Sequence, residues 1–152
     1  MRQMRFGMVC MLAVYVMAFS GCKTLSSPSG VLETALAALQ ENDLEAFSST
    51  LYGSALAQYG SIQGMEQLRQ RISGYKKFDL GTPIKLSSER LRHDQWLTTY
   101  SVEVFGLETG TERINRIGTA ITPCWTHVKT GYRSQGNKSN QKVASCRISA
   151  LR

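Results

Sequence analysis

The chain has 152 residues, of which 18 are Lys or Arg and 11 are Asp or Glu, so its net charge is +7. This length is sufficient for one domain around a single hydrophobic core. The sequence contains no Gly-rich phosphate loop, no serine nucleophile elbow and no acidic metal cluster. We therefore expect no cofactor and no metal ion, and no residue is assigned a catalytic role.

The first 21 residues have the features of a secretory signal peptide. Arg2 and Arg5 form a basic start, and an uncharged apolar run of 14 residues extends from Phe6 to Phe19. A membrane-spanning helix needs about 20 apolar residues. The apolar region of a signal peptide has about 7–15 residues, so the run fits an export signal.

A four-residue motif follows the apolar run. Phe19-Ser20-Gly21-Cys22 resembles the lipobox of bacterial lipoproteins, although Leu is commoner than Phe at the first position. The resemblance implies that residues 1–21 are removed, that the Cys22 thiol is diacylglycerated and that its new amino group is acylated, for example with palmitate. Lys23 stands where an Asp often marks inner-membrane retention, which favours the periplasmic side of the outer membrane. The alternative is an ordinary signal peptide cut nearby, with Cys22 as a free thiol.

Removal of 21 residues leaves 131 residues with 16 basic and 11 acidic side chains, a net charge of about +5. Residues 22–30 are polar and turn-prone, which predicts a short tether, and residues 31–152 form the expected domain.

Positive charge is concentrated in the C-terminal third of the chain. No acidic residue follows Glu112, and the basic residues after it are Arg113, Arg116, Lys129, Arg133, Lys138, Lys142, Arg147 and Arg152. Such a region can contact anionic lipid headgroups, acidic glycans or nucleic acid. Because these residues are spread over strands and a loop, we interpret them as a solvated sheet face and expect no nucleic-acid partner.

Two amphipathic helices are predicted at the start of the domain. The first extends from about Val31 to Gln40, with Ser29 as its cap and apolar residues recurring at three- and four-residue spacing. Asn42 is the predicted cap of the second helix, and Glu45 lies three residues later as in a capping box.

A turn and a further helix follow. Tyr52-Gly53-Ser54 has the composition of a turn. The third predicted helix extends from about Ile62 to Ser73, with Ser61 as its cap and Gly74 after its end.

From Phe78 onward the hydrophobic period changes from 3.6 to 2, which predicts strands. Strands are expected at about Ile84–Ser88, Trp96–Phe105, Arg113–Val128 and Lys142–Leu151. Pro123 lacks a backbone N–H and therefore belongs on an edge, at a bulge or at a break. His93 and Asp94 lie in a predicted turn, and we interpret them as an exposed turn in preference to a catalytic pair.

The cysteines predict one disulfide. Cys10 leaves with the signal peptide and Cys22 takes the lipid, which leaves Cys124 and Cys146 in an oxidising compartment. In a hairpin that turns near Gln135, opposed residues have numbers that sum to about 270, as these two do. Cys124 and His127 also have a Cys-x-x-His spacing, but strand alternation places them on opposite faces, so a metal site is not favoured.

Helices followed by long antiparallel strands predict an α+β fold. The segment Leu36 to Phe47 resembles the opening of NTF2-like domains, which often begin with an ALxxxDxxxF phrase; lipoproteins of the DUF4878 type join such a domain to a lipobox. The resemblance implies N-terminal amphipathic helices packed on a curved antiparallel sheet, a cone with an apolar pocket at its open end. Enzymes with this fold, such as ketosteroid isomerase and limonene epoxide hydrolase, hold an acid/base Asp or a Tyr–Asp pair in the cone. Tyr75, Trp96 and Tyr100 are the candidates for lining the pocket.

These features predict a membrane-anchored exported lipoprotein that acts as a non-enzymatic binding or interaction module at the bacterial cell envelope. Its expected partners are the membrane, through the lipid anchor, and a small apolar ligand or an envelope protein; a homodimer is a further candidate. Two alternatives stay open. One is a small NTF2-like enzyme of the isomerase or hydrolase type, and the other is a structural envelope protein that contacts anionic surfaces through its basic C-terminal sheet.

Overall fold

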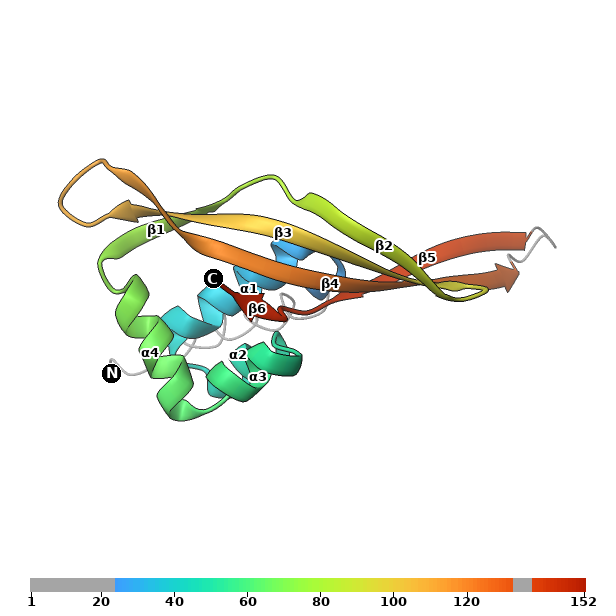
Figure 1. Ribbon diagram of the computed structural model, residues 1–152, viewed down its shortest axis with the longest axis horizontal. Coiled ribbons are helices and arrows are strands. Elements are labelled where there is room, and N and C mark those ends of the chain that lie inside the picture. The colour runs from blue at the N-terminus through green and yellow to red at the C-terminus, as the bar shows by residue number, and fades with distance from the viewer. Residues whose placement is uncertain (1–23, 133–137) are drawn as a thin grey trace, which may run out of the picture.

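The computed structural model describes residues 24–132 and 138–152. Within these ranges the chain forms a short 3-10 helix, four α-helices and then six strands that belong to one antiparallel sheet. Figure 1 shows the helices gathered on one face of a long, curled sheet, which continues past them at one end. The predicted α+β fold, with N-terminal helices packed on a curved antiparallel sheet, is therefore confirmed.

The first helix, α1 (Pro28–Glu41), begins earlier than predicted because Ser27 caps it instead of Ser29. The Ser27 Oγ accepts a hydrogen bond from the backbone N–H of Gly30 at 3.0 Å, and Pro28 occupies the first turn, where its missing N–H costs nothing. The 3-10 helix η1 (Thr24–Ser26) precedes it, and Leu25 packs against the core. Folded structure thus begins inside the segment that was predicted to be a tether.

The cap of α2 (Leu44–Ser49) also differs from the prediction. Asp43 is the cap, and its carboxylate accepts a hydrogen bond from the Ala46 N–H at 3.0 Å. Asn42, the predicted cap, instead ends α1 in the left-handed conformation with φ of 58°. This is one of the few non-glycine residues that adopt that conformation readily.

Helix α3 (Gly53–Tyr59) was predicted only as a turn. Gly53 has a φ of +57°, which favours glycine, so the turn signal is real but the chain becomes helical directly after it. Helix α4 (Ile62–Ile72) matches its prediction: Ser61 caps it and accepts a hydrogen bond from the Gly64 N–H at 3.1 Å. Within the described ranges, no helix is both long and apolar enough to cross a bilayer.

The sheet is built around two long central strands. Its strands are β1 (Tyr75–Leu80), β2 (Ile84–Arg92), β3 (Gln95–Glu108), β4 (Ile114–Tyr132), β5 (Lys138–Cys146) and β6 (Ala150–Leu151). Strands β1 and β2 follow one another along the free side of β3, and β5 and β6 do the same along the free side of β4. Strand β1 was not predicted, and the predicted last strand is divided into β5 and β6.

Pro123 explains this division. Cys124 pairs with Cys146 in β5, whereas Ile121 pairs with Ala150 in β6, so the register shifts by one residue opposite Pro123. The Pro123 carbonyl accepts a hydrogen bond from the Arg147 N–H at 3.1 Å, but the proline has no N–H to return. The chain bulges at this point and turns Ile148, which is 1% exposed, into the core.

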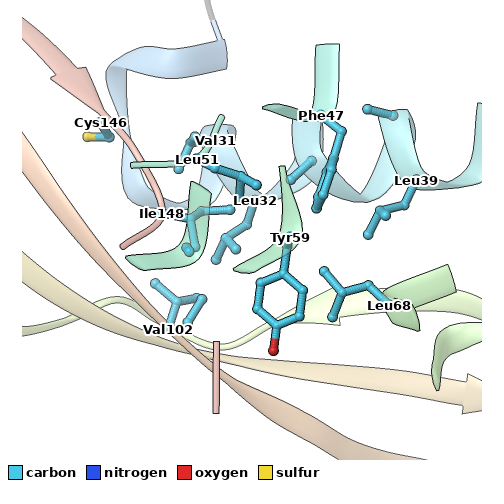
Figure 2. Close-up of a cluster of buried hydrophobic side chains, with 14 of the residues drawn as sticks. Val31, Leu32, Leu39, Phe47, Leu51, Tyr59, Leu68, Val102, Cys146 and Ile148 are labelled. Atoms are coloured by element: carbon cyan, nitrogen blue, oxygen red, sulfur yellow. The ribbon is translucent and has the colours of Figure 1, made fainter. Parts of the chain in front are cut away.

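We divide the molecule into a body and an arm. The arm consists of residues 84–98, 125–132 and 138–145, which form the part of the sheet that extends beyond the helices in Figure 1. The body is the rest of the described chain. Its core joins side chains from all four α-helices to Val102 and Cys146 of the sheet and to Ile148, which lies between β5 and β6, as Figure 2 shows.

Candidate functional site

An apolar hollow lies in the body between the helices and the sheet. Its walls come from α1, α2 and α4, and its floor comes from β3, β4 and the C-terminal segment that includes β6. It is lined by Leu32, Ala35, Leu36, Leu39, Phe47, Leu68, Arg71, Ile72, Val104, Ile117, Gly118, Thr119, Ile148, Leu151 and Arg152. The hollow measures about 600 Å³ with the open solvent at its mouth, of which about 70 Å³ accepts water-sized atoms.

The helical walls follow from the apolar periodicity of the sequence. Leu32, Ala35, Leu36 and Leu39 recur at the three- and four-residue spacing that aligns side chains along one face of α1. On α4, Leu68 and Ile72 are four residues apart and line the hollow from the other side. The same stripes that bury the helices therefore supply the apolar walls.

The floor depends on a close backbone approach at Gly118. A Cβ atom there would lie 2.5 Å from the carbonyl oxygen of Arg152, so the position has no room for a side chain. Next to it, the Thr119 N–H donates to the Arg152 carbonyl and the Arg152 N–H donates to the Thr119 carbonyl, both at 2.9 Å. These bonds hold the end of the described chain against β4 and beside the hollow.

Two arginines are the charged residues among the lining. Arg71, in the last turn of α4, and Arg152, after β6, are both exposed. Neither guanidinium forms an ion pair or hydrogen bond with the part of the chain that the structure describes. Arg69 behaves differently: it pairs with Glu66 at 2.8 Å and donates to the Leu39 carbonyl at 3.0 Å. The hollow thus has an apolar interior and two cations without internal partners.

A second, more open hollow adjoins the first, because Leu39 and Ile72 line both. Its room for water-sized atoms is about 250 Å³, compared with about 70 Å³ in the first hollow. Its other lining residues are Gln40, Glu66, Arg69, Gln70, Ser73, Tyr75 and Phe78. It is more polar than the first hollow and lies where α1 and α4 meet β1.

The three aromatic residues predicted to line one pocket lie in different places. Tyr75 lines the second hollow and packs near Phe78, with ring centroids 6.3 Å apart. Trp96 lies in the arm, where the Arg90 guanidinium is 5.8 Å from its ring centroid. Tyr100 is half-buried against the core and lines neither of these two hollows. The structure does not bring these three side chains together.

The structure pairs the two predicted disulfide partners. Cys124 and Cys146 are directly opposed in β4 and β5, with Cα atoms 4.1 Å apart and their sulfurs joined. Both residues are buried, at 3% and 0% exposure. The disulfide lies at the boundary between the body and the arm, beside the bulge at Pro123.

Ionisable side chains of the kind that catalyse proton transfer do not line the main hollow: its lining includes no Asp, Glu or His. His93 and Asp94 form the exposed turn between β2 and β3, where the Arg90 guanidinium donates to the His93 carbonyl at 2.9 Å. Among the described residues, no three His, Cys, Asp or Glu side chains are grouped so as to hold a metal ion.

The structure adds residues that the sequence did not single out, chiefly Leu36, Arg71 and Arg152. The α1 stripe was visible in the sequence, but nothing in the pattern indicated that Arg152 returns to the end of α4. The predicted lipidation site Cys22 and the signal peptide 1–21 lie outside the described residues. No model of a known protein family matches the chain, and the comparison with curated proteins finds no match.

Proposed function

We propose that the protein is an exported, lipid-anchored binding module that holds a small apolar ligand in the hollow between its helices and its sheet. The observation that carries this proposal is the hollow itself, which opens to solvent yet is lined almost throughout by aliphatic and aromatic side chains. Ligand sites are typically concave and apolar with a few polar groups that orient the ligand. An NTF2-like cone would have such a site, and a binding role needs no acid or base inside it.

The packing of η1 supports the anchoring half of the proposal. Leu25 is packed against the core, so only Lys23 and Thr24 separate it from Cys22. An extended chain spans at most about 3.6 Å per residue, so a lipid on Cys22 would hold the body within roughly 11 Å of its attachment point. The body that contains the hollow would then stay at the membrane surface, where ligands that partition into the bilayer are concentrated.

The ligand is tested by native mass spectrometry on a chain that begins at Lys23. The core lies within residues 25–151, so this chain keeps every core contact. We expect the exported protein to retain a small molecule, and Ala35→Leu, which fills the hollow from α1, to release it. Ala37→Leu makes the same change on the exposed side of α1 and is the matched control.

Leu36→Phe tests the same hollow independently, in case Ala35→Leu fails to fold. If the parent protein is a monomer without a bound molecule, and it also binds no added apolar compound, the binding proposal is refuted. If the protein is instead a dimer without a bound molecule, the open sheet face would be interpreted as a dimer interface.

The anchor is tested by metabolic labelling with a radioactive fatty acid. Cys22→Ala should abolish the label, and the protein should no longer be found in the membrane fraction. Cys10→Ala removes another cysteine from the same N-terminal stretch and should leave labelling unchanged. Label that persists on Cys22→Ala would show that the lipobox interpretation is wrong.

A further inference from the structure

We infer that the ligand of the hollow is an anionic amphiphile, a molecule with one slender apolar tail and a carboxylate or phosphate head held by Arg71 and Arg152. This inference rests on the proposed binding function and specifies the chemistry of its ligand. We argue the inference from two independent properties of the hollow, its charge and its volume.

The charge argument concerns the two arginines. A guanidinium offers several N–H donors in a planar fork and is suited to carboxylates and phosphates. Arg71 and Arg152 are 81 positions apart in the sequence (152 − 71), yet both line this hollow. Neither has an anionic partner among the described residues, whereas the neighbouring Arg69 is paired with Glu66. The hollow therefore presents two guanidinium groups, and its described lining includes no Asp or Glu side chain to neutralise them.

The volume argument concerns the tail. Compact drug-sized ligands occupy pockets of about 300–1,000 Å³. The room for water-sized atoms here is about 70 Å³, in a space bounded by Leu36, Phe47 and Leu68. A volume this small excludes a rigid, multi-ring compound, and a single unbranched chain is the apolar group that needs the least room. Its head would lie with Arg71 and Arg152, which line the hollow and are exposed.

The test compares decanoate with decanol, which share a tail and differ in the charge of the head. Binding to the chain from Lys23 is measured by isothermal calorimetry near neutral pH, at low and high salt. We expect decanoate to bind at least about fivefold more tightly than decanol, an advantage of about 1 kcal/mol, and to lose that advantage as salt rises.

Three variants locate the head. Arg71→Gln and Arg152→Gln should each weaken decanoate binding about fivefold and leave decanol binding unchanged. Arg92→Gln, an exposed arginine of the arm, removes the same charge and should change neither. Ala35→Leu should weaken both compounds equally, because it acts on the tail.

The outcomes separate the inference from the function on which it rests. Equal affinity for decanoate and decanol, unchanged in both arginine variants, would refute the inference that the ligand has an anionic head. The proposal that the hollow binds an apolar ligand would remain supported. Binding of neither compound at millimolar concentration would refute the inference and count against the binding function as well. Decyl phosphate bound more tightly than decanoate, with the same arginine dependence, would support the inference and identify phosphate as the preferred head.

Discussion

The long strands β3 and β4 extend through both the body and the arm, but the two regions differ in what covers the sheet. In β3, Val102 and Val104 are 0% and 8% exposed in the body, whereas Trp96 and Thr98, on the same face of the strand, are only half-buried in the arm. Strand β2 is exposed along its whole length, including Ile84 and Leu86 at 61% and 56%. Alternation in the sequence therefore specifies the strands, and the extent of the helices decides where they are buried.

The arm keeps features that discourage pairing with other sheets. Register shifts interrupt the pairing of β2 with β3 at Leu86 and at Leu91. Lys85, Arg90 and Arg92 place positive charge along the same strand. Bulges and basic side chains are common devices that prevent an exposed edge strand from recruiting another chain. The arm is thus an open surface whose edge is protected.

The largest expected effect belongs to the body. Phe47 is 0% exposed and packs between the helices and the sheet, so Phe47→Ala should lower the free energy of unfolding by about 3–5 kcal/mol. Urea denaturation measures the change. Leu56→Ala, at a residue 44% exposed on α3, serves as the control and should change stability little. A loss below about 1 kcal/mol for Phe47→Ala would contradict the division into a packed body and an open arm.

The next effect belongs to the boundary. Replacing both Cys124 and Cys146 by Ala removes a cross-link between residues 22 positions apart and should cost about 3 kcal/mol. The melting temperature should fall to that of the reduced parent protein, and reductant should not lower it further. Two titratable thiols in the folded parent under oxidising conditions would contradict this prediction.

A smaller effect is expected where Tyr52, just before α3, contacts Trp125, the first arm residue of β4. The rings of Tyr52 and Trp125 are 5.0 Å apart in a T-shaped arrangement. A double-mutant cycle with alanine should give a coupling of about 0.5–1.5 kcal/mol. The same cycle with Trp96, the other tryptophan of the arm, should give a coupling near zero. Similar couplings for both tryptophans would mean that the arm responds as a whole.

The smallest effect belongs to the arm itself. Leu86→Ala should change the free energy of unfolding by no more than about 0.5 kcal/mol, because the Leu86 side chain is exposed. The same truncation of a buried leucine in the body would cost more. Val102→Ala in the body is the contrasting variant. Hydrogen exchange should show faster exchange for β2 amides on the free edge than for β3 amides beside Val102. Equal protection would indicate that a partner covers the arm.

The sequence predicted those features that depend on local patterns. The Ser61 cap, the alternation in β3 and the opposition of Cys124 to Cys146 follow from neighbours along one helix or one hairpin. Helix α3 was missed because Gly53 indicated a turn, although Ala55 and Tyr59 lie four residues apart and are both buried. Strand β1 was missed because the register shift after Tyr75 breaks its alternation.

The candidate site was less predictable because it depends on contacts between distant segments. Arg71 and Arg152 are far apart in the sequence, and the pairing of β6 and Arg152 with β4 brings Arg152 to the hollow. The predicted aromatic set failed to assemble because strand alternation does not indicate how far along the sheet the helices reach. Tyr75 and Trp96 lie near opposite ends of the same sheet.

The bridge between Leu51 and Ile148 has a consequence for biosynthesis. The Tyr52 N–H donates to the Ile148 carbonyl at 2.8 Å, and the Ala55 N–H, in the first turn of α3, donates to the Ser149 carbonyl at 3.2 Å. These partners lie more than 90 positions later in the sequence, so the helices emerge from the ribosome long before the segment that completes them. Such long-range closure is slow and comes late in folding. Until residues 148 and 149 are synthesised, Tyr52 and Ala55 lack these partners, so the segment between α2 and α3 and the first turn of α3 are among the last parts of the fold to close.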